Sequence, residues 1–174
     1  NFNRVFELAR GEFFMWAAGH DVRHPTQVSR CLEVLSKDSS IVLCYSQVIW
    51  VDDEGEPLET VNEYIDTRGL PDKIVRLNVV LWSLQGGFPI YGVFRTDALK
   101  RTAVYTSVIS PDMSLLIELA MIGKFAFIPE PPFKLRRARD HGDLEVYVAK
   151  HFKGGTIGKS PQKLYWRMMR ELSA

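Results

Sequence analysis

Residues 12–18 read Glu12-Phe13-Phe14-Met15-Trp16-Ala17-Ala18, and all six residues after the glutamate are apolar. A second mostly apolar run covers residues 41–51, Ile41-Val42-Leu43-Cys44-Tyr45-Ser46-Gln47-Val48-Ile49-Trp50-Val51. A half-exposed strand alternates apolar and polar side chains, whereas a strand covered on both faces reads as nearly continuous apolar sequence. Both stretches therefore predict strands that lie in a parallel or mixed sheet and are covered on both faces.

Helical patterns alternate with these runs along the chain. The apolar spacing and the helix stop signals predict helices over residues 2–9, 25–36, 71–84, 97–101 and 110–122, and again over 143–152 and 161–172. Further strands are expected over 89–95, 124–128 and 133–137, with a turn at 52–55 and a loop over 56–68. Alternation of this kind predicts an α/β fold with a mixed, mostly parallel sheet flanked by helices.

Composition favours one ordinary globular domain over residues 1–174, with a helical extension over 142–174. The 174 residues are 46% hydrophobic and 25% charged, and the formal net charge is only +1. A balance this close to zero argues against a nucleic-acid partner. Apolar runs are too short to span a bilayer, so we expect no transmembrane segment and a cytoplasmic location, free or at the inner face of a membrane. The cysteines, Cys31 and Cys44, lie in apolar surroundings that predict buried free thiols.

Several segments, in this order, resemble family 2 glycosyltransferases of the GT-A type. They are residues 11–21 with Pro25 and 30–35, residues 89–95 with Ala98 and Leu99, and Asp112 with 115–120, 123–125 and 128–130. The resemblance covers roughly residues 3–141 and extends to order and spacing. It implies an enzyme that transfers a sugar from a nucleotide-diphosphate donor to a hydroxyl acceptor, with inversion at the anomeric carbon.

The resemblance also implies a divalent metal, Mn²⁺ or Mg²⁺, held against the donor's diphosphate. Asp21 matches the second acid of the family's metal-binding pair, and His20 stands where the first acid is expected. His141 lies in a segment similar to one that supplies a further metal ligand. Because imidazole suits softer transition metals better than magnesium, His20 is a departure from the pattern. The alternative for these residues is a polar loop that leaves a strand.

The same resemblance assigns Asp112 as the general base that takes the proton of the acceptor hydroxyl. The alternative is an acid that stabilises the start of a helix through the helix dipole. Arg136, Arg137 and Arg139 belong to the densest basic cluster of the chain and match phosphate oxygens well, which predicts a diphosphate site. The alternative for this cluster is a solvated basic strand edge.

The family's members begin with further strand and helix units that bind the nucleotide base, and this chain starts after them. We therefore expect weak donor binding, and an exposed apolar sheet edge or face that pairs with a second copy or with the missing N-terminal segment. The expected partners are a nucleotide sugar and a glycan or lipid-linked acceptor. The rival interpretation is a degenerate, non-catalytic transferase domain that serves as a binding or assembly module.

Overall fold

The computed structural model describes residues 2–19, 21–106, 108 and 110–137. The chain divides into two compact units, one formed by residues 1–106 with 110–137 and the other by 107–109 with 138–174. All described residues except Val108 belong to the first unit. The helices expected at 143–152 and 161–172, and with them the extension over 142–174, lie outside the described residues.

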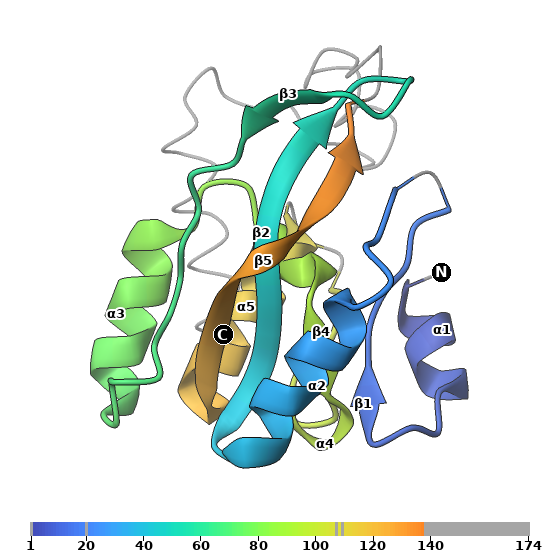
Figure 1. Cartoon of the computed structure of the whole chain (residues 1–174). Helices are drawn as coiled ribbons and strands as arrows, with labels where there is room; N and C mark the ends of the chain where they lie inside the picture. The colour runs from blue at the N-terminus through green and yellow to red at the C-terminus, as the bar shows by residue number, and fades with distance from the viewer. Residues whose placement is uncertain (1, 20, 107, 109, 138–174) are drawn as a thin grey trace, which may run out of the picture. The chain divides into compact units, whose positions relative to one another are not determined.

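A five-stranded mixed sheet forms the centre of the first unit (Figure 1). Its middle strand, β2 (Ile41–Val51), pairs in parallel along its length with β5 (Lys124–Arg136). On its other side β2 pairs with β4 (Val93–Arg95) near its start and with β3 (Pro57–Thr60) near its end. The short β1 (Phe13–Phe14) pairs with β4. The fold is therefore α/β, as the alternation of patterns predicts.

The expectation of a mostly parallel sheet is wrong, because β1–β4, β2–β4 and β2–β3 are all antiparallel and only β2–β5 is parallel. The reason lies in residues 61–67, which were expected to be part of a loop. Val61 donates its amide to Val48 late in β2, whereas Thr67 donates to Phe125 early in β5. Residues 61–67 thus run along the sheet from the end of β2 towards its start. The helix α3 then returns the chain towards the end of β2, so the chain enters β4 from that side and runs antiparallel to β2.

Helices cover both faces of this sheet (Figure 1). One face packs against α2 (Gln27–Lys37), through a cluster that includes Cys31, Leu35 and Cys44. The other packs against α3 (Lys73–Ser83) and α5 (Pro111–Ile122), through a larger cluster that includes Leu43, Phe94, Leu116 and Phe125. Cys31 and Cys44 are buried free thiols, as expected. None of the described helices combines the length and apolar character needed to cross a bilayer.

Two predicted strands are shorter than expected. β1 contains only Phe13 and Phe14, although the apolar run continues to Ala18. Residues 89–95 divide into a 3₁₀ turn, η1 (Phe88–Tyr91), and β4, because Pro89 has no amide to donate and the turn is closed by bonds from Ile90 to Gly87 and from Gly92 to Pro89. In contrast, the strands expected over 124–128 and 133–137 are joined in the single strand β5, which ends at Arg136.

Apolar side chains are exposed on the helices at both margins of the unit. On α3, Ile74, Val75 and Trp82 are exposed, and Trp82 keeps 87% of its surface accessible. On α1 (Phe2–Leu8), Val5 and Leu8 are exposed as well. In the described part of the chain β1 pairs only with β4. Association through such a face or edge stays a prediction. The remaining helix, α4 (Thr96–Leu99), follows β4 directly.

Candidate active site

Four of the residues predicted for the site are described: Asp21, Asp112, Arg136 and Arg137. The other three, His20, Arg139 and His141, lie outside the described residues.

Asp21 lies in the loop that follows β1 and is tied to the end of β5. Its neighbour Val22 forms an antiparallel bridge with Lys134, in which each amide donates to the other's carbonyl at 3.0 Å. The backbone amide of Arg136 donates to Oδ1 of Asp21 at 3.3 Å. The acid that follows the first predicted strand is therefore placed beside the segment of β5 that carries the basic cluster.

Arg23 fixes this loop from within. Its Nη2 donates to the carbonyl of Trp16 at 2.9 Å, and its Nη1 donates to the carbonyl of Tyr91 at 2.9 Å and to the amide oxygen of Gln27 at 3.1 Å. The guanidinium lies 4.5 Å from the ring centroid of Phe133. Burial lowers the pKa of Arg23, and the neighbouring charge of Asp21 partly offsets this effect. Sequence reasoning missed this residue, because two of its three hydrogen-bond partners are backbone carbonyls, and one of these, that of Tyr91, is 68 positions away.

Asp112 lies in the first turn of α5, on a helix whose N-cap residue, Ser110, has a left-handed backbone with φ 56°. Its Oδ1 accepts the amide of Met113 at 2.9 Å. A β-carbon on Gly87 would lie 2.9 Å from Oδ2, so the turn before η1 is in close contact with the carboxyl group. Burial raises the pKa of Asp112, and the Met113 amide only partly offsets it. A raised pKa makes a carboxylate a stronger base, which suits a group that accepts a proton.

Tyr91 connects the two acids. Burial raises the pKa of its phenol, the charges of Asp21 and Asp112 raise it further, and Arg23 opposes them. The charges of both carboxylates thus raise the pKa of one phenol, although the two acids lie about 90 positions apart in the sequence. Tyr105 also has a raised pKa through burial and then through Asp112. We predict that Asp21 and Asp112 face one cleft, and Tyr91 is the group whose pKa both of them affect.

The two described arginines make contacts within the protein. Arg136 donates through Nη1 to the carbonyl of Asp53. Arg137 donates through Nη2 to Glu59 at 2.7 Å, and its guanidinium lies 5.4 Å from the ring centroid of Trp50. An exposed ion pair such as Arg137–Glu59 contributes about 0–1 kcal/mol, so a diphosphate could displace it. A diphosphate role for these side chains stays a prediction.

The described residues do not form a metal site by themselves. Of the three predicted ligands only Asp21 is described, and its Oδ1 already accepts an amide. Within residues 2–19, 21–106, 108 and 110–137, no group of three or more His, Cys, Asp and Glu side chains could hold a metal ion. The metal site stays a prediction, because His20 and His141 lie outside the described residues.

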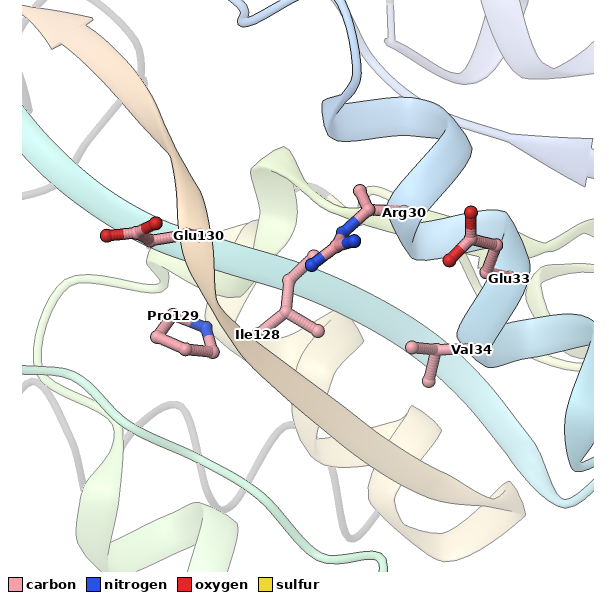
Figure 2. Close-up of a pocket in the computed structure, with 6 residues that line it drawn as sticks. All are labelled: Arg30, Glu33, Val34, Ile128, Pro129 and Glu130. Atoms are coloured by element: carbon pink, nitrogen blue, oxygen red, sulfur yellow. The ribbon is translucent and has the colours of Figure 1, made fainter.

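A groove of about 480 Å³ lies between α2 and the middle of β5 (Figure 2). It is lined by Arg30, Glu33, Val34, Ile128, Pro129 and Glu130. None of these was predicted for the site. The groove is on the α2 face of the sheet, whereas Asp112 belongs to α5 on the other face, and we give it no role in the chemistry.

Glu63 is a further acid that sequence reasoning missed. It follows β3, in the stretch 56–68 that was expected to be a loop and where no pattern indicated a site, yet only 3% of its surface is exposed. Its carboxylate accepts the amides of Gly86 and Phe88, on either side of the glycine that touches Asp112.

A scan against protein-family models found no match, and a comparison with curated proteins gave no significant match.

Proposed function

We propose that this chain is a glycosyltransferase-like domain of the GT-A type, which transfers a sugar from a nucleotide-diphosphate donor to a hydroxyl acceptor with inversion. The observation that carries the proposal is the environment of Asp112. It is a half-buried carboxyl with a raised pKa, and it shares the neighbour Tyr91 with Asp21. The order of motifs from residue 11 to residue 130 supports the same function.

In the proposed reaction Asp112 accepts the proton of the acceptor hydroxyl. The hydroxyl oxygen then forms a bond to the anomeric carbon, while the bond from that carbon to the diphosphate oxygen breaks. The nucleoside diphosphate leaves with the electron pair and carries the developing negative charge. General base assistance of this kind contributes typically 10²–10⁴-fold.

Residues of the β5 end and of the loop after β1 would receive the leaving diphosphate. Arg136 and Arg137 supply positive charge there, and Arg23 holds the loop in place. The resemblance implies a divalent metal at Asp21, and a bound metal would supply positive charge to the same diphosphate. The raised pKa of Tyr91 keeps its phenol protonated, so it can donate a hydrogen bond to a substrate oxygen.

The second candidate is a non-catalytic binding or assembly module. The contacts of the arginines favour it, because Arg137 is paired with Glu59 and Arg136 donates to a backbone carbonyl, so both side chains already have partners within the protein. The two candidates differ in one measurable respect. The enzyme requires the carboxylate of Asp112, whereas the module does not.

The test is release of nucleoside diphosphate from a panel of nucleotide sugars, with simple glycosides as acceptors. We expect turnover by the unmodified chain and a loss of roughly 10²–10⁴-fold in Asp112→Asn. Asp97→Asn is the matched control, since Asp97 is an exposed acid in the first turn of α4 that pairs with Lys100. Turnover that survives in Asp112→Asn, or is absent from the unmodified chain with every donor, contradicts the enzyme and favours the module.

A further inference from the structure

Glu63 occupies a position where an ionisable side chain is rarely found. Along residues 61–67 the chain alternates between buried and exposed positions, and Val61, Glu63, Ile65 and Thr67 are the buried ones. Carboxylates are almost never this deeply buried unless they are paired. No lysine or arginine pairs with Glu63 in the part of the chain that the structure describes. Its burial therefore points to a local role.

The partners of Glu63 are backbone amides of the turn that connects α3 to η1. Oε2 accepts the amide of Gly86 at 3.1 Å and that of Phe88 at 3.4 Å. Backbone amides of one turn that converge on one oxygen form an anion-binding concavity. Oε1 is buried as well and has no partner among the described residues. The carbonyl of Glu63 accepts the hydroxyl of Tyr45, which fixes the segment to β2.

The same turn is in contact with Asp112 on its other side. Gly87 lies between the two amides that Glu63 holds, and its backbone is in the left-handed region with φ 71°. A β-carbon on Gly87 would be 2.9 Å from Oδ2 of Asp112 and 3.3 Å from its Cγ. A shift of this turn would therefore change the space available to the Asp112 carboxyl group.

We propose that Glu63 is a positioning residue for Asp112. Glu63 holds the turn of residues 86–88 against this general base and does not itself touch the substrate. This inference rests on the proposed function. Removing the acceptor at position 63 releases both amides, lets the turn move, and admits water to Asp112. A conservative acceptor at the same position preserves the contact.

The test compares Glu63→Gln with Glu63→Leu in the full chain. Both variants remove the charge, but only glutamine keeps an oxygen that can accept the two amides. Thr67→Val is the matched control, since Thr67 is buried in the same segment and its hydroxyl accepts an amide of β5, that of Phe125, at 2.8 Å. Thermal unfolding establishes that each variant is folded.

The first readout is the carboxyl titration of Asp112 by ¹³C NMR, which needs no transferase activity. Tyr91 and Tyr105 are the ionisable groups that Asp112 acts on, and both are unchanged in these variants. We expect the pKa of Asp112 to be lower in Glu63→Leu than in Glu63→Gln, because water reaches the carboxyl only in the former. Equal values in the two variants overturn the proposal.

The second readout is kcat, which we expect to fall roughly 10- to 100-fold in Glu63→Leu, with KM for the donor unchanged, and to recover in Glu63→Gln. Thr67→Val should keep the unmodified rate. A loss of kcat in Glu63→Gln as large as in Glu63→Leu also overturns the proposal. If the unmodified chain shows no turnover while the Asp112 titrations differ, it is the proposed function that fails.

Discussion

Replacing Gly87 by alanine tests the contact between the turn and Asp112 most directly. At φ 71° an alanine costs about 1–2 kcal/mol of stability. Its β-carbon would also lie 2.9 Å from Oδ2 of Asp112, whereas ordinary contacts begin near 3.4 Å, so the carboxyl oxygen must retreat by several tenths of an ångström. A displacement of the general base by this distance should lower kcat roughly tenfold, because a displacement of ~1 Å can lower the rate 10²-fold.

Gly55→Ala is the matched control for this experiment. Gly55 also has a positive φ, 90°, but no atom lies within 4 Å of the β-carbon that alanine would add. Both variants should lose about 1–2 kcal/mol in urea unfolding. Only Gly87→Ala should shift the carboxyl carbon resonance of Asp112 and lower kcat. If the two variants leave that resonance equally unchanged, Gly87 does not constrain Asp112 and the reasoning fails.

Three further predictions concern stability. Because the pKa of Asp112 is raised in the folded state, its stabilising contribution is present below pH 3.8 and is lost as pH rises through the folded pKa. The free energy of unfolding of Asp112→Asn relative to that of the unmodified chain should therefore grow over this window, by about 1.4 kcal/mol for each unit by which folding raises the pKa. Urea unfolding in which this difference shrinks as pH rises contradicts the prediction. Arg23→Met should lower the free energy of unfolding by about 2–4 kcal/mol, because three hydrogen bonds disappear. Arg30→Met, at an exposed position, should change it by less than about 0.5 kcal/mol. Equal losses in the two variants would refute the role of Arg23. Gly92→Ala would bring a β-carbon to 2.6 Å from a carbonyl of β2 and should cost about 1–3 kcal/mol, whereas Gly19→Ala meets nothing within 4 Å, so thermal unfolding should separate the two.

The elements that the sequence predicts well are those whose pattern is long and whose environment is uniform. β2 has the predicted bounds of residues 41–51, because its side chains are buried on both faces. α5 has the predicted bounds within one residue, since Pro111 suits its first turn and Gly123 follows its end. A mostly apolar stretch of about ten residues with clear end signals is enough to specify such elements.

Pairing direction could not be predicted in the same way. The descent of residues 61–67 beside the sheet depends on single hydrogen bonds, such as that from Thr67 to Phe125, which join segments 58 positions apart. A stretch with Glu63 and Thr67 at its buried positions shows no apolar alternation in the sequence. This stretch sets the direction of β4, so reading it as a loop made the sheet appear parallel.

For the candidate site, sequence reasoning proposed Asp21 and Asp112, and it missed Arg23 and Glu63, which hold the segments beside them. Asp21 and Asp112 stand at recognisable places in motifs, next to a strand and at a helix start. Arg23 and Glu63 act on backbone groups of other segments, and such partners leave no trace in local spacing. Tyr91 becomes relevant only because folding places it near both acids.

The pairing of β2 with β5 also has a consequence for how the protein folds during synthesis. Ile41 of β2 pairs with Lys124 of β5, and Phe13 of β1 pairs with Arg95 of β4. In both cases the partner strand is synthesised roughly 80 residues later. At about 5–20 residues per second, the ribosome needs roughly 4–16 s to supply it. During that interval the nascent chain carries an 11-residue apolar strand without its parallel neighbour. Long-range pairing of this kind slows folding, and it makes the nascent chain a natural client for chaperones that bind extended apolar segments.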